Sequence, residues 1–110
     1  MSKYDLNQRF YKKLSASTSD TFEYVPANGE KLLLVNVGVS SSSVPSTVAH
    51  ICWDIDGTPE VIISSYGEVI QTNIDHLVIG DGAKKLCITL VNDLTEPTFL
   101  GAFWQGVILI

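Results

Sequence analysis

The acidic residues of CWDIDGTPEVIISSYGE, residues 52–68, are the strongest candidates for chemistry in this chain. Asp54 and Asp56 are two residues apart, so on a strand both carboxylates project from one face, with Cα atoms about 6.5–7 Å apart. Glu60 follows the turn sequence Asp56-Gly57 and would reach the aspartates across a hairpin. Since carboxylates so placed are able to share a divalent cation, Asp54, Asp56 and Glu60 form a candidate metal site.

A metal is one of three interpretations of these acidic residues. Calcium takes about six to eight oxygen ligands, whereas this stretch supplies the first two acidic positions of an EF-hand loop and has Ser65 at the twelfth. A pair of glycosidase carboxylates is the second interpretation, but nothing else in the sequence supplies a substrate cleft. In the third, which we favour, Asp54 faces solvent and Asp56-Gly57 makes the turn.

Histidine and cysteine offer a second kind of chemistry. His50 shares its predicted strand face with Cys52 and Asp54, which would allow a histidine–cysteine or histidine–aspartate contact. However, Cys52 lies between Ile51 and Trp53, which fits an inert packed thiol better than an accessible nucleophile. Without an export signal we expect reduced thiols, and without a zinc-binding spacing we expect no cofactor. Since the sequence contains no complete catalytic set, we also expect no catalytic residue and no enzymatic activity.

Aromatic residues make sugar binding an alternative function. Tyr66, in the sequence SSYGE, is the candidate for stacking on a sugar ring, and Gln71 and Asn73 are polar residues close to it in sequence. Tyr66, Gln71 and Asn73 are therefore the candidate ligand-binding residues of a lectin-like module. The competing hypothesis is that most aromatic side chains of the chain lie in the core.

The composition favours self-association and disfavours several partners. Of the 110 residues, 45% are hydrophobic and only 17% are charged, below the roughly 25% that is typical of globular chains. The spare apolar surface favours a homo-oligomer. The net charge of −5 disfavours nucleic acid. The apolar runs are shorter than the roughly 20 residues of a membrane helix, and the N-terminus lacks the apolar region of a signal peptide, so we expect a cytoplasmic product without membrane insertion.

Short apolar runs bounded by Gly, Pro, Asn, Asp or Ser predict an all-β chain. We expect an antiparallel β-sandwich or jelly roll with strands near residues 21–26, 31–39, 48–55, 59–64, 68–72, 74–79, 84–92 and 98–109. The sequences Asn28-Gly29, Asp56-Gly57 and GDGA, residues 80–83, predict tight turns. The last strand is apolar on both faces, which is typical of a central strand or one covered by another layer.

The first residues differ in charge from the rest of the chain. Residues 1–14 contain four basic residues and one acidic residue, a net +3, which leaves −8 on the remainder. We expect residues 1–20 to be an arm that docks on a neighbouring subunit or, less often, touches nucleic acid, or else an ordinary frayed terminus. Residues 21–110 are expected to be one β-sandwich domain. Leu6, Phe10 and Leu14 are four residues apart, a spacing that also predicts a short amphipathic helix in the arm.

The closing residues GDGAKKLCITLVND and FLGAFWQG resemble the last strands of small β-sandwich proteins encoded by phages and prophages. The resemblance covers the last third of the chain and contains no catalytic or ligand motif. It implies a jelly-roll-like virion or accessory protein that assembles with itself and with other virion proteins. We therefore expect a non-enzymatic structural protein, found in the virion if phage-encoded, with binding of a surface glycan as the alternative.

Overall fold

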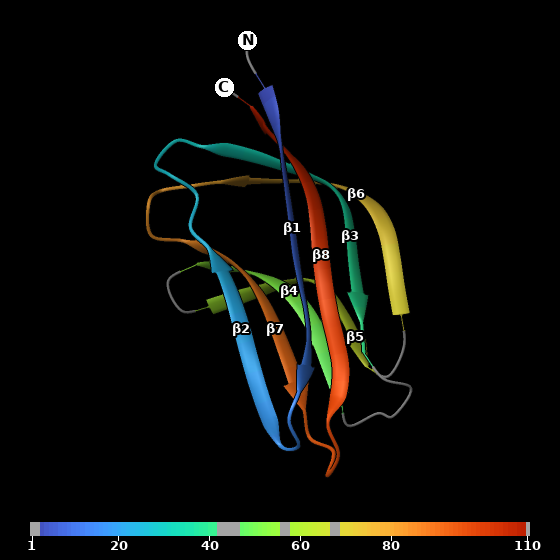
Figure 1. Ribbon diagram of the computed structural model, residues 1–110. Helices are drawn as coiled ribbons and strands as arrows, with labels where there is room; N and C mark the ends of the chain where they lie inside the picture. Colours follow the sequence, from blue (N-terminus) through green and yellow to red (C-terminus); the bar gives the residue numbers. More distant parts are fainter. Residues whose placement is uncertain (1–2, 42–46, 56–57, 67–68, 110) are drawn as a thin grey trace.

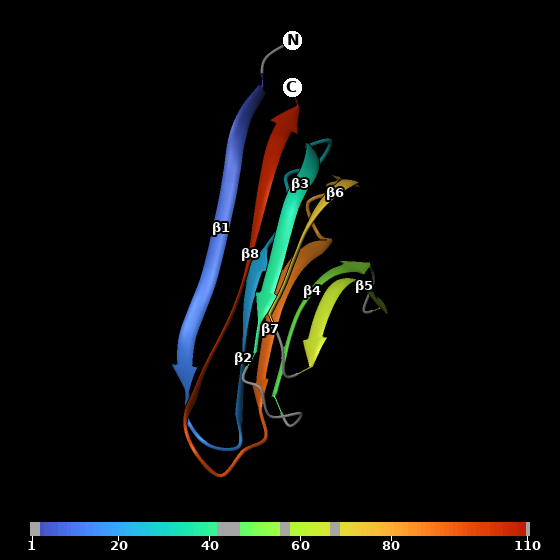
Figure 2. The same ribbon diagram turned by 90° about the vertical axis from the view of Figure 1, so that its right-hand side faces the viewer.

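The computed structural model describes residues 3–41, 47–55, 58–66 and 69–109, and this described part consists of β-strands without a helix. The strands form a four-stranded sheet of order β1-β8-β3-β6, sheet A, and a four-stranded sheet of order β2-β7-β4-β5, sheet B (Figures 1 and 2). The strands are β1 (Lys3–Leu14), β2 (Thr18–Tyr24), β3 (Lys31–Ser40), β4 (Thr47–Ile55), β5 (Thr58–Tyr66), β6 (Val69–Ile79), β7 (Lys85–Asn92) and β8 (Thr98–Leu109).

This strand order confirms the predicted antiparallel sandwich. The neighbouring strands in both sheets run antiparallel. Consecutive strands alternate between the two sheets, except for β4 and β5, which are neighbours in sheet B. Crossovers of this kind are typical of a jelly roll. Within the described residues, no helix is long and apolar enough to cross a membrane.

Alternation along the strands builds the core. On β7, Leu86, Ile88 and Leu90 are fully buried, because every second residue of a strand faces the same side. On β4, Ala49, Ile51 and Trp53 face inward in the same way. Sheet A supplies the opposing layer of buried side chains, which consists of Leu14, Leu32, Leu34, Val37, Val39, Val78, Leu100, Ala102, Trp104 and Ile108.

The doubly apolar last strand is central, as predicted. β8 lies between β1 and β3 in sheet A, so both of its edges are hydrogen-bonded. Trp104 of β8 is fully buried and reaches across to sheet B, where its ring lies 6.1 Å from that of Phe22 and 6.4 Å from that of Tyr24. These tilted aromatic contacts join the two layers.

The predicted helix in the first residues is wrong, because residues 3–14 form strand β1 along the whole of β8. Leu6, Phe10 and Leu14 all point toward the core, since a spacing of four residues is also two periods of a strand. The expected boundary after residue 20 falls within β2. The division into an arm, residues 1–20, and one β-sandwich domain, residues 21–110, stays a prediction.

Two other strand predictions need correction. β6 is a single strand over Val69–Ile79, although Asn73 suggested a break between two shorter strands. Asn73 instead pairs with Asn36, next to a bulge in β3 between Leu34 and Asn36. β2 begins at Thr18, three residues before the predicted start at residue 21.

The predicted turns at Asn28-Gly29 and GDGA lie next to each other, and both connect the two sheets rather than forming hairpins. Gly29 and Gly82 have φ values of 81° and 84°, which glycine adopts without strain. The Gly29 amide donates to the Gly80 carbonyl at 2.9 Å, and the Gly80 amide donates to the Glu30 carbonyl at 2.8 Å. Asp56-Gly57 lies outside the described residues.

A buried asparagine holds the opposite end of the sandwich. The Asn92 side-chain amide donates to the carbonyls of Leu14 and Ser15, each at 3.2 Å, and to that of Glu96 at 3.0 Å. Its side-chain carbonyl accepts from the Leu94 amide at 3.0 Å. One side chain therefore joins the β1–β2 connection to the β7–β8 connection.

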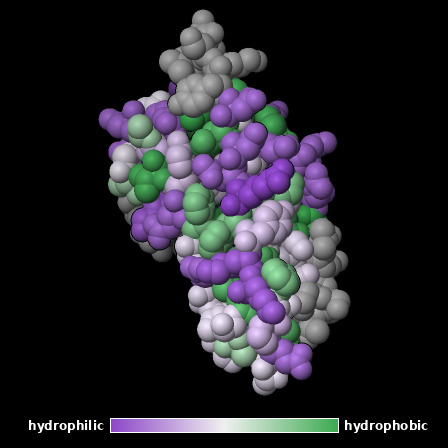
Figure 3. All heavy atoms as spheres, viewed as in Figure 1, coloured by the Kyte–Doolittle hydropathy of each residue, from purple (hydrophilic) through white to green (hydrophobic). Residues whose placement is uncertain are grey.

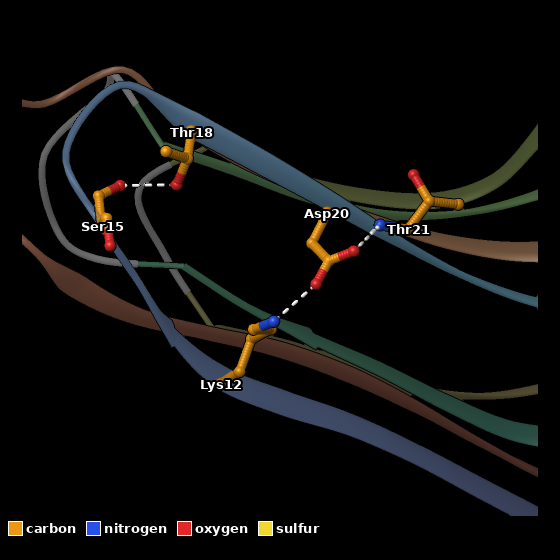
Figure 4. Close-up of polar contacts among 5 residues, drawn as sticks. All are labelled: Lys12, Ser15, Thr18, Asp20 and Thr21. Atoms are coloured by element: carbon orange, nitrogen blue, oxygen red, sulfur yellow. Dashed lines mark hydrogen bonds and ion pairs between the residues drawn. The ribbon is translucent and has the colours of Figure 1, made fainter.

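Polar contacts join the two sheets near the β1–β2 corner (Figure 4). Lys12 of sheet A forms a 2.5 Å ion pair with Asp20 of sheet B, and this hydrogen bond, with the Thr21 amide, lowers the pKa of the Asp20 carboxyl. Thr18 Oγ1 donates to the Ser15 carbonyl at 2.7 Å. The basic residue Lys12 thus acts within its own chain.

We expect Asn92→Ala to lower the free energy of unfolding by about 2–4 kcal/mol, because it leaves buried backbone groups without partners. Urea unfolding followed by tryptophan fluorescence measures this loss. Asn73→Ala is the matched control, since Asn73 is exposed on β6. Equal stability of the two variants would show that the Asn92 hydrogen bonds are not needed.

Candidate functional site

Hollows open on the outer faces of both sheets. One lies on sheet A, is lined by Arg9, Tyr11, Gln71, Phe103 and Gln105, and has a volume of about 450 Å³; we call it the aromatic hollow. Another lies on sheet B and has a volume of about 310 Å³; we call it the thiol hollow, and it is lined by Thr21, Glu23, His50, Cys52, Val61, Lys85, Cys87 and Thr89. Both are within the size range of small-molecule sites.

The aromatic hollow collects residues from three strands that are distant in sequence. Arg9 and Tyr11 come from β1, Gln71 from β6, and Phe103 and Gln105 from β8. Their side chains share the outer face because Arg9 pairs with Phe103 in the β1–β8 register, and Phe103 and Gln71 both pair with Gly38 of β3. In Figure 3, hydrophilic and hydrophobic residues intermix on the side where β1 and β8 lie in front.

Two glycines allow the aromatic rings to cover the sheet. A Cβ atom on Gly101 would overlap the ring of Tyr11, and a Cβ atom on Gly38 would overlap the ring of Phe103. Each ring therefore occupies the space that a side chain on the neighbouring strand would fill. Tyr11 still has 53% of its surface exposed, so it remains available to a ligand.

The polar groups of the aromatic hollow have few partners in the protein. In the described ranges, Arg9 forms no ion pair, and the side chains of Gln71 and Gln105 form no hydrogen bond. Burial raises the pKa of the Tyr11 hydroxyl, whereas the positive charge of Arg9 acts to lower it. The hydroxyl is therefore protonated at neutral pH and is able to donate a hydrogen bond. The hollow thus combines ring surface with amide, hydroxyl and guanidinium groups.

Asn36 adds an unsatisfied acceptor beside the aromatic hollow. It is the register partner of Gln105 on one side and of Asn73 on the other. Its Oδ1 atom is buried and accepts no hydrogen bond from the described part of the protein. Buried polar atoms are nearly always hydrogen-bonded, so this oxygen is an acceptor that a donor beside the hollow would satisfy.

The thiol hollow contains the residues for which the sequence suggested a histidine–cysteine contact. Cys52 of β4 lies directly opposite Cys87 of β7, a pairing that the sequence did not reveal. Both are thiols, and Cys52 is 5% exposed, which fits the predicted packed thiol. Lys85 and Glu23 form an ion pair of 3.1 Å at this hollow, and burial lowers the pKa of His50.

The candidate sugar-binding residues lie on two different sheets. Tyr66 is the last residue of β5 in sheet B, and its side chain is outside the described part. Gln71 and Asn73 are exposed on β6 in sheet A. Gln71 lines the aromatic hollow, whereas the aromatic residues there are Tyr11 and Phe103, which the sequence did not single out.

The candidate metal ligands are only partly described. In the backbone register of sheet B, Asp54 lies opposite Lys85 on one side and Pro59 on the other. Glu60, which is exposed, lies opposite Trp53. Asp56 lies outside the described residues. Among the residues that the structure describes, no three His, Cys, Asp or Glu side chains are grouped to hold a metal ion. The site Asp54, Asp56 and Glu60 therefore stays a prediction.

Comparisons with known proteins give fold-level similarity at most. No protein-family model and no curated protein matches the chain. Two solved structures from infectious bursal disease virus are similar to this chain. The structure of the VP2 subviral particle has a TM-score of 0.42 and 11% sequence identity. The structure of the Gt strain has a TM-score of 0.35 and 13% sequence identity. Each match covers 97% of this chain but 32% of the viral chain, so this chain spans about a third of their length. No function follows from similarity at this level.

We expect Gly101→Ala to destabilise the fold by about 1–3 kcal/mol, because the added methyl group displaces the Tyr11 ring. Adding Tyr11→Ala should recover part of this loss, with a coupling of at least about 0.5 kcal/mol. Urea unfolding of the two single variants and the double variant measures the coupling. Strictly additive losses would mean that the ring does not depend on the glycine.

We expect His50 to make the protein less stable in mild acid. Burial lowers its pKa below 6.5, so the unfolded chain takes up a proton first as the pH falls through about 6.5. The free energy of unfolding then decreases from pH 7.5 toward more acidic values, and His50→Gln should flatten this decrease. Thr21→Val, in the same hollow, is the control. An unchanged pH profile in His50→Gln would contradict the assignment.

Proposed function

We propose that this chain is a non-enzymatic assembly protein that associates with copies of itself through the outer face of sheet A. The observation that supports this function is a patch of apolar side chains at one end of that face. We call it the apolar end, and it comprises Leu33, Val35, Leu77, Ile79, Val107 and Leu109.

The apolar end runs across three neighbouring strands. Val107 of β8 pairs with Leu33 of β3, which pairs with Leu77 of β6, so the three side chains form a row. Leu77 and Ile79 have 48% and 50% of their surfaces exposed. An exposed apolar group of this kind is typical of a surface that another protein covers.

Charges around the apolar end suit a second copy of the chain. Lys31 lies within it as the register partner of Ile79, and Asp5 pairs with Val107 at its border. Asp75 precedes Leu77 by two residues on β6. Within the described part, Lys31, Asp5 and Asp75 form no ion pair. In a two-fold contact, the lysine of one copy would approach the aspartates of the other.

The narrower form of this proposal is a virion component. The resemblance of the closing residues to phage-encoded sandwiches supports a phage particle as the assembly, with other virion proteins as further partners. The absence of a complete catalytic set in the sequence supports a protein without enzymatic activity.

We expect the purified chain to form dimers or larger oligomers at about 1–100 µM. Leu77→Asp should raise the dissociation constant by about 10-fold or more, because it places a charge in the centre of the contact. Sedimentation velocity over this concentration range measures both.

Phe99→Asp is the matched control for this experiment. Phe99 is 70% exposed and belongs to the same outer face, but it lies at the other end of β8. Its replacement should leave the association unchanged. A strict monomer of the unchanged chain, or equal weakening by both substitutions, would contradict self-association through the apolar end.

Carbohydrate binding is the second proposed function, and one observation favours it. Gln71, a predicted sugar-binding residue, lines the aromatic hollow together with Tyr11 and Phe103. Sugars are bound in proteins by ring surfaces together with amide groups, and both occur in this hollow. Asn73 lies at its border as the register partner of Asn36.

A further inference from the structure

We infer that the aromatic hollow binds an acidic saccharide, a chain of pyranose rings that carry carboxylates. This inference rests on the proposed carbohydrate binding and names its ligand class. It comes from the Arg9 guanidinium, which forms no ion pair within the described residues, from the two rings held against glycines, and from the amide groups of Gln71 and Gln105 beside the buried Oδ1 atom of Asn36.

The rings provide the stacking surface. Tyr11 and Phe103 come from neighbouring strands, and each lies over a glycine of the next strand instead of standing away from the sheet. This arrangement fixes both rings by packing before a ligand arrives. A row of two rings on a sheet surface suits the apolar faces of successive sugars better than a single small ligand.

The polar groups of the aromatic hollow match sugar hydroxyls. Four of the five lining residues, Arg9, Tyr11, Gln71 and Gln105, carry side-chain hydrogen-bonding groups. Each glutamine amide offers both a donor and an acceptor, as does a sugar hydroxyl. The buried Oδ1 atom of Asn36 is a further acceptor beside Gln105. A purely apolar ligand would leave these groups unpaired.

Arg9 determines the charge of the ligand. A guanidinium binds a carboxylate through two parallel hydrogen bonds, and the described part of the chain offers Arg9 no carboxylate within ion-pair distance. Lys13, four residues further along β1, is not among the residues that line the hollow, and its Nζ atom lies 5.8 Å from the centre of the Phe99 ring. A carboxylate on the sugar would therefore be favoured over a neutral group at this position.

Binding of trigalacturonic acid and of its trimethyl ester tests this inference. Isothermal titration calorimetry in EDTA compares the two probes, which differ in the charge of their carboxyl groups, and EDTA removes cation bridges. We expect the acid to bind the full chain about 10-fold more tightly than the ester. Arg9→Gln should abolish that difference, and Tyr11→Leu should weaken both probes.

Two controls separate a specific site from general attraction. Lys13→Gln removes a neighbouring charge of the same strand and should change either affinity by no more than about twofold. Leu77→Asp, designed to prevent self-association, should keep the affinity for the acid. Circular dichroism and thermal unfolding of each variant establish that it is folded.

The outcomes distinguish the inference from the function on which it rests. Equal binding of acid and ester, both lost in Tyr11→Leu, would retain carbohydrate binding and overturn the acidic class. Equal weakening by Arg9→Gln and Lys13→Gln would also overturn it. No binding of either probe at millimolar concentration would overturn both proposals.

Discussion

The position of β8 is the constraint on which the structure depends. The last strand of the chain lies between the first and the third, and its inner face supplies Leu100, Ala102, Trp104 and Ile108 to the core. Sheet A forms only when β8 is in place, because β1 and β3 each pair with β8 and not with each other. Such a fold relies on pairings between distant parts of the chain, which are slow to form but restrict the final arrangement strongly. Asn92 secures the same arrangement at one end, where the connection leading into β8 meets the one leaving β1.

The aromatic hollow follows from the way in which β8 fits into sheet A. The rings of Tyr11 and Phe103 lie over Gly101 and Gly38 of the neighbouring strands, and they leave no room there for a side chain. Glycine weakens a strand, and the covering rings offset this by shielding its backbone. The packing that stabilises the centre of sheet A therefore also exposes ring surface next to Arg9 and the glutamines. Fold and candidate site share the same residues.

Sequence patterns predicted the fold well where only one period fitted. β7 alternates without ambiguity, and the strand predicted near residues 84–92 is observed over Lys85–Asn92. β1 was mistaken for a helix because positions four residues apart share a face in both helices and strands. β6 was divided at Asn73 because asparagine is common in turns, whereas here it lies opposite the bulge of β3. The turns at Asn28-Gly29 and GDGA were located correctly, but both connect different sheets, which local turn chemistry does not encode.

The sequence by itself determined an all-β chain with a two-layer core, few charges, and no complete catalytic motif. It also identified Gln71 as a candidate for ligand binding. Only the tertiary structure decided that Gln71 joins Arg9, Tyr11 and Phe103, and that Cys52 lies opposite Cys87. The physical reason is that alternation with a period of two residues shows which face of a strand is apolar, but not which strand lies beside it. That choice depends on how all eight strands share one core, so the candidate site appeared only after the sheets were assembled.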